Sequence, residues 1–263
     1  MKALAIENYG KKPNFLDFPM PKINNDEVLV EIYAASINPL DTKIRKGELK
    51  LLLKYKMPLI LGNDFSGKIV EVGTSVTKFK VGDEVYGRPR ANKMGTFTEY
   101  LSVNQEDIAL KPKNLSFEEA ASIPLVGLTS YQALHDILRI EKGHKILIHA
   151  GSGGVGTFAI QLAKHMGAFV ATTASDGTDL VKSLGADEVI NYKTERFEHS
   201  IRDYNAVLDT IGGATLEKSF VTLKKGGKIV SISGIPNGRF AKENGFSSFK
   251  KTLFSIASYK LTK

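Results

Sequence analysis

The sequence contains no cysteine. This absence excludes disulfide bonds, thiolate-ligated zinc and a cysteine nucleophile within these 263 residues. No apolar run reaches the length that crosses a membrane, and the first residues, MKALAIENYG, do not form an apolar stretch followed by a small-residue cleavage site. From these features we expect a cytoplasmic protein without a membrane partner.

Acidic residues are outnumbered, with 28 aspartates and glutamates against 36 lysines and arginines, for a net charge of +8. The basic residues are spread along the chain, and no nucleic-acid recognition motif or aromatic-rich basic stripe accompanies them. A solvated basic surface that attracts a phosphate-bearing cofactor therefore explains the charge better than a nucleic-acid partner does.

The two parts of the chain have different patterns. Up to about Lys113, short strand-like runs such as EVLVEIYAAS alternate with turn residues, which is typical of a barrel-like or sandwich-like β domain. Ser116 with Glu119 three residues later then predicts a capped helix start, and Pro124 interrupts before a second helical segment. From Lys145 onward, strand-like and helix-like segments alternate, as in a parallel sheet with crossover helices.

A glycine-rich stretch, HAGSGGVGTFAIQLAKHMGA, covers residues 149–168. It follows an apolar strand-like run at 146–148 and opens a segment with apolar residues at helical spacing. In such a G-x-G-x-x-G turn the first glycine permits the tight turn, the second lets the backbone approach a pyrophosphate, and the third lets the helix approach the strand. In this context we predict a dinucleotide site rather than a purely structural glycine corner, with these phosphate-binding residues: Gly151, Ser152, Gly153, Gly154, Val155 and Gly156.

The residue after the second strand of such a fold selects between NAD and NADP, because an acidic side chain there binds the ribose of NAD. Ser175 falls at this position, about 20 residues beyond the glycines, and a serine does not repel a 2′-phosphate. The cofactor is therefore predicted to be NADPH. Asp176 favours the alternative, since one residue of register error would make it the ribose ligand, although it could also simply cap the following helix.

Several short motifs occur in order along the chain: INPLD (37–41), LGNDFSG (61–67), GLTSYQAL (127–134), SLGADEVINY (183–192) and LDTIGG (208–213). Together with the glycine turn, they closely resemble the medium-chain dehydrogenase/reductase superfamily, specifically its zinc-independent quinone oxidoreductase branch. The resemblance implies an α/β protein with a GroES-like, β-rich substrate domain over residues 1–118 and a doubly wound Rossmann domain over 119–263. It also implies an active site between the two domains.

Zinc-dependent alcohol dehydrogenases of the same superfamily carry a cysteine in the first of these motifs and a His-Glu pair in the second. Here residues 38–41 read NPLD, and Asn63 and Asp64 follow Gly62. The five histidines show no HExxH arrangement, so no metal site is predicted. Without a metal, the chemistry most consistent with the site is hydride transfer from NADPH to a quinone or to the β-carbon of an α,β-unsaturated carbonyl.

The resemblance places three substrate-pocket candidates in the first domain. Asn38 and Asp41 would line the pocket, with Asn38 hydrogen-bonding the acceptor oxygen, although both could simply shape the loop around Pro39. Tyr55 is either a pocket aromatic or proton donor, or a residue that packs on the core.

Further cofactor contacts are expected in the second domain. Thr129 resembles the residue that approaches the nicotinamide, unless its hydroxyl bonds back to its own helix. Tyr192 resembles a position near the adenosine phosphate, with Lys193 beside it and Lys182 as a looser candidate. Three more candidates follow later strands, at the edge where doubly wound sheets bind ligands: Asp209, Gly212 and Ser233.

Relative to the family's layout, only five Rossmann strands are evident, and the final segment, FKKTLFSIASYKLTK, has the pattern of an amphipathic helix. We therefore expect the sixth strand and a return segment to be missing, and with them the strand that commonly builds a homodimer interface in the family. Two alternative functions remain: a zinc-free NADP-dependent alcohol or carbonyl dehydrogenase, and a non-catalytic nucleotide-sensing or RNA-binding protein on the same fold.

Overall fold

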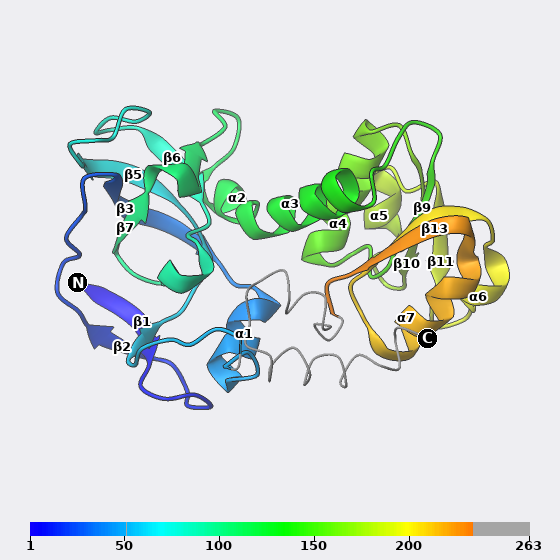
Figure 1. Cartoon of the computed structure of the whole chain (residues 1–263), viewed down its shortest axis with the longest axis horizontal. Coiled ribbons are helices and arrows are strands. Elements are labelled where there is room, and N and C mark those ends of the chain that lie inside the picture. The colour runs from blue at the N-terminus through cyan, green and yellow to red at the C-terminus, as the bar shows by residue number, and fades with distance from the viewer. Residues whose placement is uncertain (51, 234–263) are drawn as a thin grey trace. The chain divides into compact units, whose positions relative to one another are not determined.

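The computed structural model describes residues 1–50 and 52–233. It divides into two compact units, Met1–Val126 and Gly127–Lys263 (Figure 1). The amphipathic helix predicted for the last residues lies outside the described part of the chain. No helix in the described part is long and apolar enough to span a bilayer.

The first unit contains two antiparallel sheets (Figure 1, blue to green). The smaller has the order β2-β1-β4 and the larger the order β7-β3-β5-β6-β8. Apolar side chains of the larger sheet, among them Val28, Val30 and Phe65, form its core. The strands are β1 (Lys2–Ile6), β2 (Asn14–Asp17), β3 (Glu27–Ser36), β4 (Leu59–Ile60), β5 (Asp64–Val72), β6 (Glu84–Gly87), β7 (Tyr100–Asn104) and β8 (Ile108–Leu110).

The register of the larger sheet brings three chain segments to one of its ends. Ser36, the last residue of β3, pairs with Asp64, the first residue of β5. Phe65 pairs with Gly87 at the end of β6, so Arg88 follows directly beside Asp64. Helix α1 (Pro39–Lys46) begins three residues after β3 ends. Polar side chains from β3, β5, α1 and the end of β6 are thereby gathered in one region.

The predicted capped helix is present as α2 (Phe117–Ala121). The backbone N–H of Glu119 donates to Oγ of Ser116 at 3.1 Å, and the Glu119 carboxylate accepts from the Ser116 N–H at 2.8 Å. This helix packs on β3, β5 and β6. The first compact unit therefore continues to Val126, whereas the division expected from the sequence falls inside α2.

The second unit has a parallel sheet with the order β11-β10-β9-β12-β13 (Figure 1, green to orange). This is the doubly wound topology predicted from the alternation, and all five predicted strands are found within the described residues. The strands are β9 (Lys145–Ile148), β10 (Phe169–Ala174), β11 (Glu188–Asn191), β12 (Tyr204–Asp209) and β13 (Leu223–Ser231). The helices are α3 (Pro124–Tyr131), which begins before the division, a π-helical segment (Gln132–Ile137), α4 (Gly154–His165), α5 (Thr178–Ser183), α6 (Phe197–Ser200) and α7 (Gly213–Ser219).

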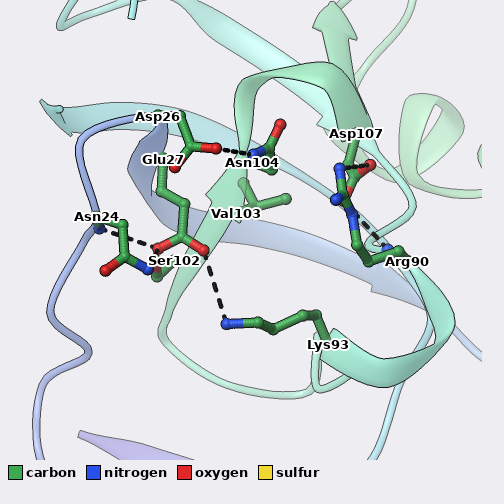
Figure 2. A pocket seen from close by; sticks show the side chains of 9 residues that line it. All are labelled: Asn24, Asp26, Glu27, Arg90, Lys93, Ser102, Val103, Asn104 and Asp107. Atoms are coloured by element: carbon green, nitrogen blue, oxygen red, sulfur yellow. Dashed lines mark hydrogen bonds and ion pairs between the residues drawn. The ribbon is translucent and has the colours of Figure 1, made fainter. Parts of the chain in front are cut away.

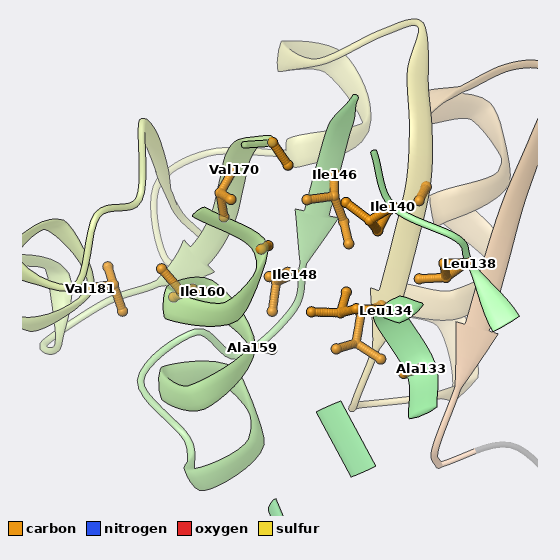
Figure 3. Packing of buried hydrophobic residues seen from close by; sticks show 14 of the residues in the cluster. Ala133, Leu134, Leu138, Ile140, Ile146, Ile148, Ala159, Ile160, Val170 and Val181 are labelled. Carbon is orange, nitrogen blue, oxygen red and sulfur yellow. The ribbon is translucent and has the colours of Figure 1, made fainter. Parts of the chain in front are cut away.

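Both faces of β9 are buried, because its side chains alternate between two apolar clusters. Ile146 and Ile148 pack with Ala159 and Ile160 of α4 on one face (Figure 3). Leu147 packs with Val207 and other apolar residues on the opposite face. The strand order reverses at β9, with β10 on one side and β12 on the other, so the carboxyl end of β9 is the switch point where doubly wound sheets bind their ligands.

Candidate active site

The glycine turn joins the buried end of β9 to the start of α4. Gly153 is the N-cap residue of α4, with φ −80° and ψ 167°, and no side chain caps this helix end. The first helical hydrogen bond runs from the N–H of Thr157 to the carbonyl of Gly153 at 2.9 Å. The N–H groups of Gly154, Val155 and Gly156 precede it, so they point out of the helix end, where the helix dipole is positive. This arrangement suits an anionic group such as a phosphate.

The three glycines of the motif have different surroundings. A Cβ on Gly151 would collide with Oγ1 of Thr172, and a Cβ on Gly156 would collide with the carbonyl of Ala150. A Cβ on Gly153 would meet only the Ala150 carbonyl oxygen, at 3.3 Å. Gly151 and Gly156 are therefore required by packing within the protein, whereas the space beside Gly153 is open to a ligand.

The tight turn itself differs from the expectation. The residue with left-handed backbone is Ala150, at φ 52°, and not Gly151. Two hydrogen bonds to Thr173 hold this conformation: Ala150 N–H donates to its Oγ1 at 3.1 Å, and Gly151 N–H donates to its carbonyl at 3.0 Å. The strain of the turn is thus borne by an alanine that neighbouring β10 fixes in place.

The segments after β10 and β11 bring the predicted adenosine-side residues together. Oγ of Ser175 donates to Oη of Tyr192 at 2.9 Å, and Nζ of Lys193 forms an ion pair with Asp176 at 2.9 Å. A Cβ on Gly177 would lie 2.5 Å from Cβ of Ser152, so this region adjoins the glycine turn. Lys182 is exposed in the last turn of α5 and has no ion pair with the described part of the chain.

Two buried titratable groups lie at the carboxyl ends of neighbouring strands: His149 directly follows β9, and Asp209 is the last residue of β12. His149 is fully buried, its Nδ1 lies 3.2 Å from Oγ1 of Thr173 and its Nε2 lies 2.9 Å from Oγ of Ser219. Burial lowers the pKa of His149 to about 4, with a smaller opposing effect from Asp209, so the ring is neutral at physiological pH. Asp209 is also fully buried and accepts hydrogen bonds from Gly212 N–H at 2.9 Å and Ser231 Oγ at 2.6 Å.

The remaining candidates of this unit lie around these strand ends. Ser233 donates from Oγ to the carbonyl of Thr210 at 2.7 Å, and Gly212 has a left-handed backbone at φ 79°. Thr129 lies half-buried on α3, and its hydroxyl makes no hydrogen bond with the described part of the chain. Asp209, Gly212 and Ser233 are therefore clustered at the carboxyl edge, as the sequence predicts.

In the first unit, Asn38 belongs to a buried polar network. Its Nδ2 donates to Oδ2 of Asp64 at 2.8 Å and to Oγ of Ser36 at 3.2 Å, and the Ser36 hydroxyl donates to the same Asp64 oxygen at 2.8 Å. Both amide hydrogens of Asn38 are thereby used, which leaves only its Oδ1, an acceptor. In this arrangement the side chain cannot donate to a substrate oxygen, and the predicted contact requires the amide to turn.

Asp41 has a positioning role in the same network. One carboxylate oxygen accepts from the N–H of Asn38 at 2.7 Å and the other from Nδ2 of Asn63 at 2.7 Å. Burial raises the pKa of Asp41, partly offset by these two donors. Because both oxygens have protein partners, Asp41 fixes the start of α1 and the orientation of Asn63, and its predicted contact with substrate stays a prediction.

Tyr55, Asp64 and Arg88 contain polar atoms without partners. Oη of Tyr55, Oδ1 of Asp64 and Nε of Arg88 are buried and make no hydrogen bond with the described part of the chain. Burial raises the pKa of Asp64 to about 6 and also raises the pKa of Tyr55. Buried polar groups are almost always satisfied, so this cluster needs a physical explanation.

Two family models match the chain. "Alcohol dehydrogenase GroES-like domain" matches residues 24–113, and "Zinc-binding dehydrogenase" matches residues 154–260. The 2-methylene-furan-3-one reductase of Solanum lycopersicum is 38% identical over 95% of this chain and 68% of its own length. The chloroplastic NADPH-dependent alkenal/one oxidoreductase of Arabidopsis thaliana has the same identity and coverage. The quinone oxidoreductase structure from Coxiella burnetii has a TM-score of 0.81 at 34% identity, over 99% of this chain and 88% of that one.

The chain belongs to the medium-chain dehydrogenase/reductase superfamily, in its quinone oxidoreductase branch. The resemblance read from the motifs is therefore confirmed, together with the fold class and the assignment as an oxidoreductase. Some relatives have chloroplastic or mitochondrial names, so the cytoplasmic location stays a prediction. The homodimer likewise stays a prediction.

One of the two matched family models is named for zinc binding, so the residues of this chain that could bind a metal ion are compared with those of zinc-dependent members. The described residues contain no group of three or more histidine, cysteine, aspartate or glutamate side chains placed to hold a metal ion. Where zinc-dependent members of the superfamily carry cysteine and a His-Glu pair, this chain has Asn38, Asn63 and Asp64, and these three residues hydrogen-bond within one network.

Sequence reasoning did not single out Ser36, Arg88 or the orphaned oxygen of Asp64. Their signal lies in the strand register, which places Ser36 and Arg88 on either side of Asp64. A pocket elsewhere in the first unit, of about 240 Å³, carries no comparable feature (Figure 2). Its charges are paired, with Arg90 bonded to Asp107 at 2.8 Å and Lys93 lying 3.7 Å from Glu27.

Proposed function

We propose that this protein is an NADPH-dependent, zinc-independent reductase that transfers a hydride to a quinone or an α,β-unsaturated carbonyl compound. The observation that carries the proposal is the uncapped start of α4 at Gly153. Three backbone N–H groups face a space there that is open only because residue 153 has no side chain. This cradle fits a pyrophosphate. The names of similar proteins, an NADPH-dependent alkenal/one oxidoreductase and quinone oxidoreductases, support the substrate class.

The adenosine end of the cofactor would lie by the segments after β10 and β11. Ser175 and Tyr192 offer neutral hydroxyls, and Lys193 offers a positive charge for a 2′-phosphate. Asp176 is already paired with Lys193, which reduces its repulsion of a phosphate. The Escherichia coli quinone oxidoreductase structure, with a TM-score of 0.80 at 27% identity, contains NADPH, which supports the same preference.

NADPH supplies the hydride, and the protein supplies binding and orientation. Gly154, Val155 and Gly156 would bind the pyrophosphate through backbone N–H groups, and Thr129 would line the nicotinamide site. In the first unit, Asp41 and Asn63 fix the loop that carries Asn38, so the polar network presents a rigid surface to the acceptor.

Oxidation of NADPH and of NADH should be followed with p-benzoquinone and with methyl vinyl ketone as acceptors. We expect turnover with at least one acceptor and a lower KM for NADPH than for NADH. Incubation with EDTA should leave the rate unchanged, since no metal takes part. Tight NADPH binding without oxidation by either acceptor would refute the reductase assignment.

A further inference from the structure

Four buried side-chain atoms of the first unit have no hydrogen-bond partner among the described residues: three belong to Tyr55, Asp64 and Arg88, and the fourth is Oγ1 of Thr96. Asp64 begins β5, and the pairing of Phe65 with Gly87 places Arg88, the residue directly after β6, beside it. The positive charge of Arg88 lowers the pKa of both Asp64 and Tyr55, so Arg88 lies within electrostatic range of each of them. The set combines a carboxyl oxygen, a guanidinium N–H and a phenol oxygen, none of them hydrogen-bonded to the described residues.

Arg88 and Asp64 do not satisfy each other. No ion pair joins them among the described residues, although opposite charges on neighbouring strands would gain by pairing. Asp64 is fully buried, and its other oxygen already accepts from Asn38 and Ser36. Leaving a buried donor or acceptor unpaired costs about 1–3 kcal/mol, and more for a charged group. Such an arrangement is accounted for if a ligand with an oxygen atom completes it.

We propose that Arg88 binds the oxygen of the acceptor and that Asp64 donates the proton which that oxygen takes up during reduction, with Tyr55 as a second hydrogen-bonding group. This inference rests on the proposed function and names the residues that stabilise charge on the acceptor. Arg88 then takes the part that a Lewis acid plays in metal-dependent enzymes, namely placing positive charge on a carbonyl oxygen.

With an α,β-unsaturated ketone as acceptor, the proposed reduction has a hydride-transfer step and a proton-transfer step. A hydride from NADPH forms a C–H bond at the β-carbon, the electron pair of the C=C bond forms a new C=C bond toward the carbonyl carbon, and the pair of the C=O bond moves to oxygen. The Arg88 N–H stabilises that negative oxygen. The O–H bond of Asp64 then breaks, an O–H bond forms on the substrate, and the resulting enol becomes the ketone after release. Solvent returns a proton to the Asp64 carboxylate.

The surroundings of Asp64 suit a group that holds and releases a proton. Burial raises its pKa to about 6, although donors at Asn38 and Ser36 and the charge of Arg88 oppose the rise. The charged group that acts on it is Arg88, directly after β6; Tyr55, from the segment before β4, is coupled to Arg88, and Asp41 of α1 is linked to Asp64 through Asn38. Helix α3 contributes only the N–H of Leu125, which lowers the pKa without reaching hydrogen-bond geometry.

The test uses Arg88→Met, Arg88→Lys and Asp64→Asn, with Arg90→Met as a matched control. Arg90 is two residues away on the same segment, but it is exposed and bonded to Asp107 (Figure 2). For native protein, kcat/KM with methyl vinyl ketone should fall as pH rises above about 6, because Asp64 loses its proton. Arg88→Met should lower kcat/KM about 100-fold, the effect of removing one oxyanion donor. Arg88→Lys should recover part of the rate, and Arg90→Met should match the native enzyme.

Asp64→Asn should lower kcat/KM about 100-fold and should remove the fall in rate above pH 6. A purely structural role would lower stability but would leave the pH profile unchanged. NADPH affinity should stay within about twofold of native in all four variants, because the phosphate-binding turn lies in the other unit. Arg88→Met with native kcat/KM, or Asp64→Asn with the native pH profile, would overturn the inference.

A second measurement separates this inference from the proposed function. The probe is p-nitrophenolate, which carries a negative oxygen on a conjugated ring and is titrated by its visible absorbance without any cofactor. Native protein should bind it and lower the pKa of the phenol, and Arg88→Met should abolish that shift. Native protein that fails both quinone and enone assays refutes the proposed function, whereas equal phenolate binding by native and Arg88→Met protein refutes the role of Arg88.

Discussion

Two substitutions in the glycine turn, Gly153→Ala and Gly156→Ala, should have separate effects on cofactor binding and on folding. Each adds one methyl group. At Gly153 the backbone angles, φ −80° and ψ 167°, are ordinary for alanine, and the added Cβ meets only the Ala150 carbonyl oxygen, at 3.3 Å. At Gly156 the Cβ would collide with that same oxygen and with the backbone of Gly151. The first change should therefore affect the ligand, and the second should affect the protein.

The expected magnitudes follow from these contacts. A glycine-to-alanine change at compatible angles gains about 0.4–1 kcal/mol from the unfolded chain, so Gly153→Ala should leave the free energy of unfolding within about 1 kcal/mol of native. Overpacking at Gly156 should destabilise by about 1–3 kcal/mol, which lowers Tm by about 2–4 °C per kcal/mol in a chain of this size. Loss of two charge-assisted hydrogen bonds to phosphate, about 1.5 kcal/mol each, predicts about 100-fold weaker NADPH binding for Gly153→Ala.

Isothermal titration calorimetry with NADPH gives the affinities, and thermal unfolding followed by circular dichroism gives the stabilities. We expect Gly153→Ala to keep the native Tm but to bind NADPH more weakly, and Gly156→Ala to have a lower Tm. A Gly153→Ala protein that binds NADPH as tightly as native protein would show that the open space beside this residue does not receive the pyrophosphate.

Three further predictions concern charge. Asp176→Asn should release Lys193 and tighten NADPH binding by up to about fivefold at low ionic strength, with less effect on NADH, as measured by titration calorimetry at two salt concentrations. Burial lowers the pKa of His149 from 6.5 to about 4, so the free energy of unfolding should fall by about 3 kcal/mol as pH falls from 6.5 toward 4, where the buried ring must take up a proton. Urea unfolding at several pH values should show this fall for native protein and not for His149→Gln. The pKa of Asp64 shifts in the opposite direction, from 3.8 to about 6, so native protein should lose stability as pH rises through that range. Asp64→Asn has no carboxyl group to ionise there and should not show this loss.

The architecture of the second unit could be predicted from local patterns. A buried strand, a G-x-G-x-x-G turn and an amphipathic helix adjoin one another in the sequence, and each signal supports the next. What the pattern could not show is which residue turns the chain. Ala150 takes the left-handed conformation, and Gly151 is needed because Thr172 on the neighbouring strand occupies the space of a side chain. That contact joins strands that are separated by a whole helix in the sequence.

The polar network of the first unit was harder to predict for a related reason. Asn38 and Asp41 could be named from a family motif, but their partners depend on strand register. The pairing of β3 with β5 contains two irregularities, near Leu29 and Ile32, which offset each other, so Ser36 lies opposite Asp64 in the same register that pairs Val28 with Val72. No periodicity in the sequence encodes which residues of two strands face each other, so the shared hydrogen bonds of Ser36, Asn38 and Asp64 appear only in the folded chain.

Asp64 and His149 show why a shifted pKa alone does not identify a functional residue. Both are fully buried, and burial is the main cause of both shifts. Both ring nitrogens of His149 have hydroxyl neighbours, on Thr173 and Ser219, so its neutral form is fully accounted for by the fold. Asp64 keeps one oxygen without a protein partner next to an arginine that also lacks one. A buried polar group that the fold leaves without a partner is better explained by a reaction than by structure, and this distinguishes Asp64, beside Arg88, from His149.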